Sequence, residues 1–358
     1  MAPVVRECLN RPEDIETVIC LTGQHREMLQ QVTDYFGLKA DVDLQLMQPN
    51  QTLAQLTARC VQGLDQVVEQ RQPDCIVAQG DTTTVMAASL VAFYRHVPLV
   101  HVEAGLRTGN MRAPWPEEMN RCITSLIATL HCAPTARSAK NLLDEKIDPS
   151  SVHVTGNTVI DALLWAVERE RANDQQWREK YAQLGDHRMV LITGHRRENF
   201  GDGFQDICKS IGTLADRYPE VEFVYPVHLN PNVRGPVFEI LGDHANIHLV
   251  EPAPYPEFVW LMDRSSVILT DSGGVQEEAP SLKKPILVMR ETTERPEAMD
   301  AGAVELVGTS AERIIARISA LLDDAVEYSR HQIDENPYGD GQAAKRIVDL
   351  MLKQNWQS

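Results

Sequence analysis

Acidic residues and a histidine come directly after short apolar runs in this sequence, where a residue can act on a bound ligand. Asp81 and Glu103 each stand at the end of such a run, and His195 follows another beside two arginines. Glu117 stands in the first turn of an expected helix. Positioned carboxylates and histidines move protons, and arginines hold phosphate or another anion. The pattern predicts acid–base chemistry on an anionic small molecule.

Each of these residues also has a purely structural interpretation. Asp81 can cap the helix that follows it, and Glu103 can pair with a cation at the end of a sheet. Arg121 lies four residues after Glu117 and three after Glu118, the spacing of a surface ion pair. A histidine after a strand is also often structural. The residue types leave both interpretations open.

The turn Ser272-Gly273-Gly274 is the sharpest local signal for a phosphate site. An apolar run ends just before it and a helix is expected just after it, so free N–H groups would face the turn. Glycine lets the backbone approach a ligand closely. Glu278, one helical turn later, could accept hydrogen bonds from the two hydroxyls of a ribose, and Arg295 could reach the same place. The alternative is a Gly-Gly turn that holds no ligand.

Apolar runs and amphipathic stretches alternate along the chain, which predicts an α/β fold with parallel sheets. The runs are continuously apolar, as in strands buried on both faces, and such sheets bind ligands beyond the carboxyl ends of their strands. Strands are expected at 17–22, 42–46, 75–79, 99–103, 152–155, 189–193, 222–226, 247–250, 266–270 and 285–289. Helices are expected at 53–70, 82–95, 116–127, 136–145, 204–218 and 311–322.

The least strand-like region, 158–186, is polar and helical, and we place the domain boundary there. The prediction is two Rossmann-like domains with a cleft between them, and a last helix that packs back. The expected parts are residues 1–157, the connector 158–186, the second domain 187–335 and the C-terminal helix 336–358.

Composition restricts the classes of function. Lys and Arg number 34 against 51 Asp and Glu, so the net charge is −17 at pH 7, which argues against a nucleic-acid-binding protein. No apolar run is long enough to span a membrane, and the first residues lack the pattern of a secretory signal. Seven scattered cysteines without a C-x-x-C pair fit reduced thiols in a cytoplasmic protein and no metal site. The common P-loop, dinucleotide-binding and hydrolase motifs are missing from the sequence.

Taken together, these stretches resemble the bacterial non-hydrolysing UDP-N-acetylglucosamine 2-epimerases. The resemblance covers nearly the whole chain in order. The matching segments are 24–29 (QHREML), 80–84 (GDTTT), 101–108 (HVEAGLRT), 115–121 (WPEEMNR), 155–162 (TGNTVIDA), 193–199 (TGHRREN), 225–232 (YPVHLNPN), 269–280 (LTDSGGVQEEAP), 292–297 (TTERPE) and 336–342 (NPYGDGQ).

The resemblance implies a fold like that of the GT-B glycosyltransferases and the interconversion of UDP-N-acetylglucosamine (UDP-GlcNAc) and UDP-N-acetylmannosamine (UDP-ManNAc). In this family UDP is eliminated to leave an enzyme-bound 2-acetamidoglucal, and is then added back to the other face. The resemblance also implies a homodimer and a place in polysaccharide biosynthesis. We expect no cofactor, no metal, no nucleic acid and no membrane among its partners.

Site residues follow from the same resemblance, position by position. The family's catalytic carboxylates and histidine correspond to Asp81, Glu103, Glu117 and His195. The UDP-sugar contacts correspond to Arg121, Ser272, Gly273, Gly274, Glu278 and Arg295. A second, regulatory nucleotide-sugar site in some members corresponds to Gln24, His25, Arg196 and His228. One of the three carboxylates is expected to move the C2 proton, and His195 to protonate or stabilise the departing UDP.

The beginning of the chain departs from the family's pattern. Met1 to Arg6 correspond to the family's first helix, so its first strand and the Gly-Thr-Arg-Pro-Glu-Ala-Ile-Lys loop are expected to be missing. Either the start codon is misassigned, or the chain is genuinely shortened. A shortened chain could be weakly active, or could be a UDP-sugar-binding regulator without turnover. Two further alternatives are a hydrolysing relative that releases UDP and free ManNAc, and a glycosyltransferase that needs an acceptor.

Overall fold

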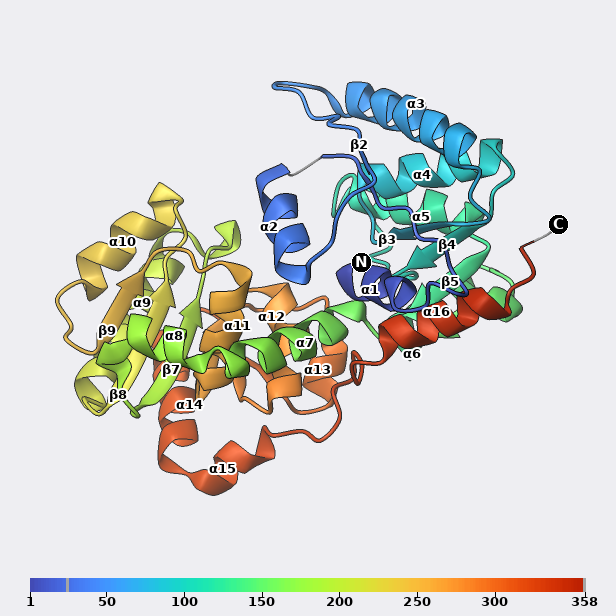
Figure 1. Ribbon diagram of the computed structural model, residues 1–358. Helices are drawn as coiled ribbons and strands as arrows, with labels where there is room; N and C mark the ends of the chain where they lie inside the picture. Colours follow the sequence, from blue (N-terminus) through green and yellow to red (C-terminus); the bar gives the residue numbers. More distant parts are fainter. Residues whose placement is uncertain (24–25, 357–358) are drawn as a thin grey trace. The chain divides into compact units, whose positions relative to one another are not determined.

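The computed structural model describes residues 1–23 and 26–356, and at 26–28 it describes the backbone alone. The chain divides into two compact units, residues 1–162 with 339–358, and residues 163–338. The division falls inside helix α7 (Thr158–Ala172), within the region expected to connect the domains. Each unit is built on parallel strands with helices between them, which confirms the predicted α/β class (Figure 1).

The first unit contains a four-stranded parallel sheet in the order β3-β4-β5-β6, and a separate parallel pair, β1-β2. Strand β5 was not expected, because its sequence Leu-His-Cys-Ala is short and carries a polar residue. The strands are β1 (Cys20–Leu21), β2 (Val42–Asp43), β3 (Ile76–Gln79), β4 (Leu99–Val102), β5 (Leu130–Ala133) and β6 (Val152–Val154).

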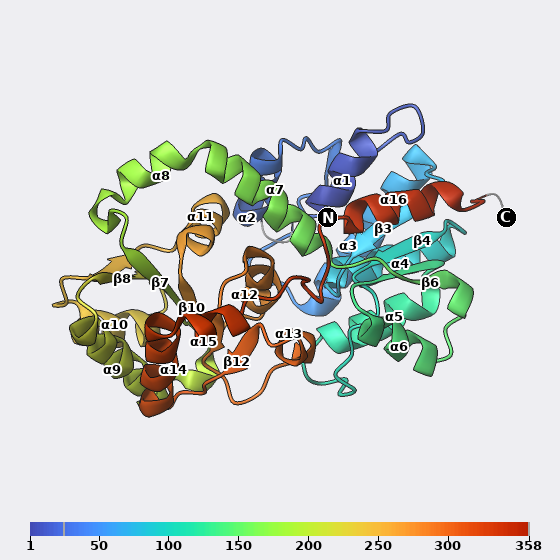
Figure 2. The same ribbon diagram turned by 90° about the horizontal axis from the view of Figure 1, so that it is seen from below.

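The first and last helices of the chain pack together in this unit, so the C-terminal helix packs back as predicted (Figures 1 and 2). Val4 and Ile347 from these two helices meet Val100 of β4 in one apolar core. The helices of this unit, besides the start of α7, are α1 (Ala2–Leu9), α2 (Arg26–Phe36), α3 (Leu53–Arg71), α4 (Thr83–Tyr94), α5 (Glu117–Ile127), α6 (Ala136–Asp144), α16 (Ala343–Lys353) and the 3₁₀ turn η1 (Pro149–Ser151).

The second unit contains a six-stranded parallel sheet in the order β12-β11-β10-β7-β8-β9. Side chains of β7, β8 and β10 pack against α9, α10 and α14 in one large apolar core. The strands are β7 (Arg188–Thr193), β8 (Val221–Pro226), β9 (Ile247–Val250), β10 (Val267–Thr270), β11 (Ile286–Val288) and β12 (Val304–Leu306), the last not expected from the sequence. The helices are α8 (Asp174–Lys180), α9 (Asp202–Arg217), α10 (Pro231–Leu241), α11 (Tyr255–Arg264), α12 (Gly273–Glu278), α13 (Pro296–Asp300), α14 (Ala311–Asp323), α15 (Ala325–Arg330), η2 (Ala182–Leu184), η3 (Arg197–Asn199) and η4 (Ala279–Leu282).

Two negative findings hold for the part of the chain that the structure describes. None of its helices combines the length and the apolar character that crossing a bilayer requires. No group of three or more histidine, cysteine or acidic side chains is arranged to hold a metal ion. All seven cysteines are free thiols.

Candidate functional site

In the first unit, the ends of β3 and β4 bring two predicted acidic positions together. The two strands are neighbours, with Gln79 opposite Val102. Gly80, which continues β3 at φ +83°, donates its N–H to the carbonyl of Val102 at 3.0 Å. A Cβ atom at Gly80 would lie 3.4 Å from Oε2 of Glu103. Asp81 therefore follows a tight turn that lies directly beside the Glu103 carboxylate.

Asp81 binds an arginine and does not cap a helix, so the capping interpretation was wrong. Helix α4 begins at Thr83 and its N-cap residue is Thr82. The carboxylate of Asp81 instead accepts from Nε and Nη2 of Arg121, at 2.9 and 2.7 Å. Asn120 holds the same turn by donating its Nδ2 to the carbonyl of Asp81 at 2.8 Å. Helix α5 thus fixes this carboxylate from one side.

Of the two acids that the helix spacing offered Arg121, Glu117 and Glu118, the structure pairs it with Glu118, which is buried and not on the surface as expected. Arg121 pairs with Glu118, whose Oε2 lies 2.9 Å from Nη1. Oε1 of Glu118 accepts the backbone N–H groups of Thr108 and Gly109 at 3.0 and 2.9 Å. Burial opposes the charged form of Glu118, but these amides and the guanidinium together hold its pKa below the ordinary value. Glu117 makes no ion pair with any described residue and is half-buried, so its carboxylate is available to a ligand.

Glu103 has a backbone conformation that few residues adopt. The expected strand 99–103 ends one residue early, at Val102, and Glu103 has φ +63°. A residue other than glycine in this left-handed region costs on the order of 1–3 kcal/mol and persists where the surroundings impose it. The chain therefore turns sharply at Glu103, and the alternation of side chains along the strand does not extend to it.

His101 lies wholly inside the first unit and supports the Gly80 turn. Burial lowers the pKa of His101 to about 4, so the ring is neutral at physiological pH. Its Nε2 lies 2.8 Å from the carbonyl of Gly80, which fixes that nitrogen as the N–H donor. The place of His101 near the site could be predicted from the sequence, but its supporting role could not.

In the second unit, neighbouring strands β7 and β10 end at the candidate histidine and at a buried acid. Thr193 lies opposite Thr270, and their hydroxyls are 2.6 Å apart. Asp271, the residue after β10, is 0% exposed. Its Oδ2 accepts the backbone N–H groups of His195 and Arg196, both at 2.8 Å. This acid binds the loop that carries His195.

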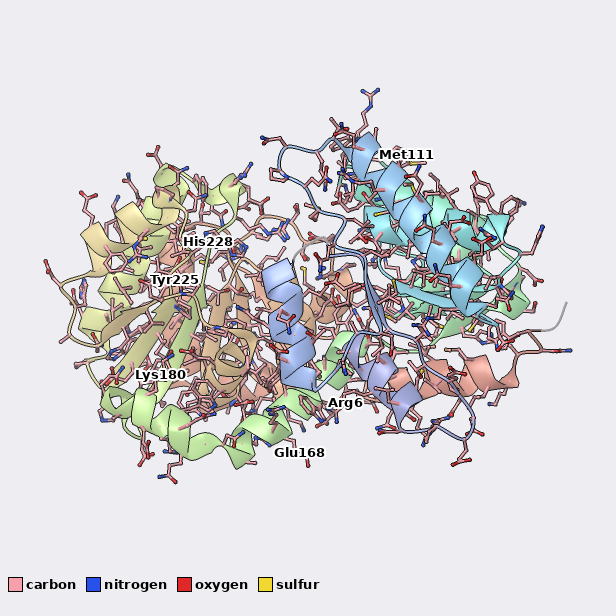
Figure 3. All side chains as sticks on the ribbon, turned by 45° about the horizontal axis from the view of Figure 1, so that its top comes forward. Arg6, Met111, Glu168, Lys180, Tyr225 and His228 are labelled. Carbon is pink, nitrogen blue, oxygen red and sulfur yellow. The ribbon has the colours of Figure 1, made fainter. Side chains whose placement is uncertain are left out.

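The ring of His195 stacks on that of His228, with centroids 5.3 Å apart and planes at 16°. His228 follows β8, where Figure 3 labels it near Tyr225. The resemblance assigned His228 and Arg196 to a regulatory site, and the structure places both beside the candidate catalytic histidine. The other two residues of that predicted regulatory site, Gln24 and His25, lie outside the described residues.

The Ser-Gly-Gly turn carries an arginine at its surface. Ser272 is the N-cap residue of α12, and Gly273 is buried. A Cβ atom on Gly273 would lie 2.7 Å from Nη1 of Arg295, so the guanidinium rests directly on this glycine. Glu277 and Glu294 hold Arg295 there, at 2.5 and 2.8 Å. Gly274 has only the hydroxyl of Ser272 nearby and stays open. The turn thus offers free N–H groups and a fixed cation together.

Glu278 is buried behind this turn. Burial, with the negative charge of Glu277 as the second cause, raises the pKa of Glu278 to about 8. The hydroxyl of Tyr255 points at its Oε1 from 3.5 Å. A buried carboxyl group with so little hydrogen bonding is well suited to a hydroxyl-bearing ligand, because an unmet acceptor inside a protein is costly.

Two polar residues near the site were not predicted from the sequence. Arg290 is 9% exposed and donates Nε to Glu198 and Nη1 to Glu294, at 2.7 and 2.8 Å. Asn199 donates its Nδ2 to the carbonyl of Met289 at 3.1 Å. The signal for Arg290 was available, since a charged residue follows the expected strand 285–289 directly.

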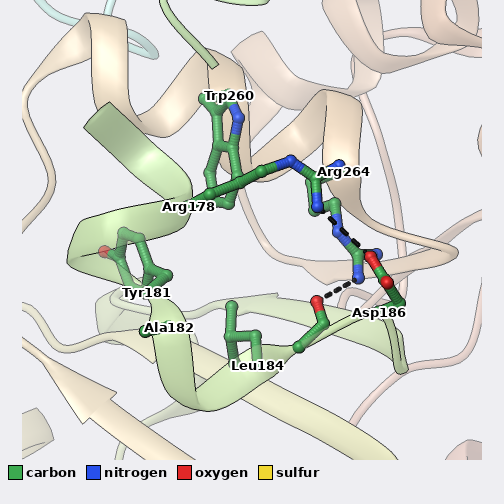
Figure 4. A pocket seen from close by; sticks show the side chains of 8 residues that line it. Arg178, Tyr181, Ala182, Leu184, Asp186, Trp260 and Arg264 are labelled. Carbon is green, nitrogen blue, oxygen red and sulfur yellow. Dashed lines mark hydrogen bonds and ion pairs between the residues drawn. The ribbon is translucent and has the colours of Figure 1, made fainter. Parts of the chain in front are cut away.

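The second unit also has a pocket of about 180 Å³, and none of the candidate site residues lines it (Figure 4). It is bounded by α8, η2 and the end of α11, and its wall includes Arg178, Trp260 and Arg264. Gly185 and Asp186 lead into β7 and Arg264 leads into β10, so the pocket sits at the amino ends of these strands. The candidate residues lie at the carboxyl ends.

Comparison with known proteins identifies the family. The sequence profile described as UDP-N-acetylglucosamine 2-epimerase matches residues 7–352. The UDP-N-acetylglucosamine 2-epimerase of Escherichia coli K12 is 50% identical over 359 residues, which cover 99% of this chain and 95% of that protein. The crystal structure of the Neisseria meningitidis UDP-GlcNAc 2-epimerase bound to UDP-GlcNAc superposes with a TM-score of 0.89 at 49% identity, covering 99% and 96% of the two chains.

A more distant structure has the same fold. The Methanocaldococcus jannaschii UDP-GlcNAc 2-epimerase, solved in complex with UDP-GlcNAc and UDP, is 30% identical and superposes with a TM-score of 0.77, covering 99% of this chain and 96% of that one. Similarity of this extent, along almost the whole sequence, establishes that the chain belongs to the UDP-N-acetylglucosamine 2-epimerase family.

Proposed function

We propose that this protein interconverts UDP-GlcNAc and UDP-ManNAc without hydrolysis. In the forward half-reaction a carboxylate takes the C2 proton, the C1–O bond breaks with its electron pair on the UDP oxygen, and a C1=C2 double bond forms. UDP then adds back at C1 while a proton is delivered to the other face of C2. Relatives that match along the whole chain are named UDP-N-acetylglucosamine 2-epimerase, and two of their structures contain UDP-GlcNAc, which supports the epimerisation.

The observation that carries the proposal is the seating of Arg295 on Gly273. A guanidinium fixed over a glycine turn, with free backbone N–H groups beside it, suits a diphosphate, which needs several donors in one place. Glu278 behind the turn suits the ribose hydroxyls. We assign Gly274 to the same diphosphate contact through its open backbone. Ser272 joins it through its hydroxyl, since the Ser272 N–H already donates to Oγ1 of Thr270 at 3.0 Å.

The proton-transfer residues in the proposal are Asp81, Glu103 and Glu117, with Arg121 at the sugar. The Asp81 turn lies against the Glu103 carboxylate, and Glu117 has no ion pair among the described residues. Removal of a proton from a weakly acidic carbon needs a positioned base that is shielded from water. His195 has one nitrogen facing Asp271, which leaves its other nitrogen to meet the departing UDP oxygen.

Proton NMR of UDP-GlcNAc in heavy water with the purified protein tests the proposal. The expected result is an equilibrium mixture of both UDP-sugars with deuterium at C2. Free ManNAc with UDP would identify a hydrolysing enzyme instead. Binding without either UDP-ManNAc or C2 exchange would identify a regulator, and sugar transfer to an added acceptor would identify a transferase.

We also propose that the protein acts as a homodimer in the cytoplasm. Phe93 and Tyr94 at the end of α4 are 64% and 63% exposed, and Leu126 near the end of the adjoining α5 is 79% exposed. Exposed apolar groups of this size favour a protein contact. The seven free thiols fit a reducing compartment. Light scattering after size-exclusion chromatography should give twice the 40.1 kDa of the chain, and Leu126→Glu should lower that mass.

A further inference from the structure

We propose that Asp271 is a positioning residue for His195, which fixes the histidine loop and selects the ring tautomer that presents Nε2 to the substrate. This inference rests on the proposed function for its catalytic consequence. Its structural part, the orientation and tautomer of the ring, depends only on residues of the second unit.

Asp271 holds the backbone of the loop. Three donors converge on its Oδ2: the N–H groups of His195 and Arg196 at 2.8 Å each, and Nδ2 of Asn199 at 3.4 Å. The buried hydroxyl of Tyr225 donates to the carbonyl of Gly194 at 2.9 Å from the other side. Tyr225 and Asp271, both buried, therefore hold the carbonyl and the N–H of the Gly194–His195 peptide group.

The second carboxylate oxygen faces the ring itself. Oδ1 of Asp271 is buried and makes no hydrogen bond within the described residues, yet it lies 3.5 Å from Nδ1 of His195. A buried carboxylate oxygen is costly without a donor, and Nδ1–H is the donor that faces it. A lone pair on Nδ1 would instead face the negative charge. Asp271 therefore favours the tautomer with hydrogen on Nδ1.

The remaining contacts leave the far side of the ring open. His228 stacks on one face of the imidazole, and the His195 side chain is 46% exposed. With Nδ1 facing Asp271, Nε2 is the nitrogen that can exchange a proton with a ligand. A carboxylate that orients a catalytic histidine in this way stabilises the imidazolium without taking its proton.

Asp271→Asn tests this arrangement. The two backbone N–H groups still require an oxygen at the Oδ2 position, so the amide nitrogen must take the Oδ1 position and donate to Nδ1. The ring is then forced into the Nε2–H tautomer. Loss of the correct tautomer costs up to about 10⁴-fold in kcat in a comparable triad. We expect kcat to fall by at least about 10²-fold while KM and the UDP Kd stay within about twofold, as for an interaction made only in the transition state.

Nitrogen-15 NMR of the imidazole, at a pH where the ring is neutral, reads the tautomer directly, with His195→Gln used to assign the signal. The wild-type ring should carry its proton on Nδ1, and Asp271→Asn should move it to Nε2. Asp161→Asn is the matched control, because Asp161 also accepts two backbone N–H groups, from Ala343 and Ala344, and contacts none of the described histidines. It should lower the melting temperature without changing the His195 signal or kcat.

The outcomes separate the two proposals. A wild-type ring with hydrogen on Nε2 overturns the inference even if the variant fails to fold. An unchanged kcat in a folded Asp271→Asn protein overturns it too. A wild-type protein that turns over no UDP-sugar would contradict the proposed function. A His195 ring with hydrogen on Nδ1 would still support the positioning role of Asp271.

Discussion

Arg121 contacts a single oxygen of Asp81: both Nε and Nη2 reach Oδ2, and Oδ1 makes no hydrogen bond among the described residues. The arginine is fixed in turn by Glu118, which is buried. A carboxylate held by one oxygen keeps its orientation and has the other oxygen available for a ligand. Asp81 therefore has both a structural partner and an open position for chemistry.

Asp81→Asn should lower kcat by at least about 10²-fold, the usual scale for a positioned acid–base group, while the protein stays folded. Asp65→Asn is the matched control. Asp65 also binds one arginine through two hydrogen bonds, to Nε and Nη2 of Arg95 at 2.6 and 2.7 Å, and lies on the surface of α3. It should leave the rate of UDP-ManNAc formation unchanged. A wild-type rate in Asp81→Asn removes this residue from the mechanism.

Glu103→Gln and Glu117→Gln should each reduce kcat by at least about 10²-fold, as for Asp81→Asn. Stability should stay nearly unchanged, since glutamine keeps the size of the side chain. Glu118→Gln is the contrast, because Glu118 holds the backbone of Thr108 and Gly109. It should lower the melting temperature. Circular dichroism melts and the NMR rate assay on the three variants separate the two effects. A Glu103 or Glu117 variant that loses stability as Glu118→Gln does would be structural.

Arg295→Ala should weaken UDP binding more than it lowers kcat, because it removes a cation from the diphosphate position. Gly273→Ala should have a similar effect, since the new methyl group would lie 2.7 Å from Nη1 and displace the guanidinium. Gly235→Ala in α10 is the control, because nothing lies within 4 Å of its added Cβ. Calorimetric titration with UDP checks all three. Unchanged affinity in Arg295→Ala refutes its role at the phosphates.

Sequence patterns were enough for the class of fold and for most strand positions. A continuous apolar run such as 189–193, bounded by polar residues, is typical of a strand buried on both faces, and it became β7. Strands β5 and β12 were not predicted, because a short strand with a polar residue looks like a loop until its neighbours cover it. The positive φ of Glu103 was also beyond prediction, since a residue other than glycine adopts it only when tertiary contacts impose it.

Candidate site residues could be chosen by their place after strands, but their partners could not. Spacing along a helix offered Arg121 either Glu117 or Glu118, and the structure pairs it with Glu118. It also pairs Arg121 with Asp81, forty residues away in the sequence, which spacing along a helix could not show. Asp271 lies in the matching segment 269–280, but no role could be assigned to it from the sequence. Only the pairing of β7 with β10 shows that it lies beside His195. Resemblance to the family, and not residue pattern, supplied the reaction.

The raised pKa of Glu278 predicts how stability depends on pH. Its pKa is about 8 in the folded protein against an ordinary 4.5, so the folded state holds a proton that the unfolded chain releases. By linkage, this group makes the free energy of unfolding fall as pH rises from about 4.5 to about 8. Glu278→Gln removes that dependence, so its stability relative to wild type should increase across this window. Urea unfolding of both proteins at several pH values measures the difference, in which contributions from other groups cancel. Two curves that stay parallel from pH 5 to pH 8 would mean, by the relation between pKa and stability, that the carboxyl group of Glu278 is already ionised in the folded protein.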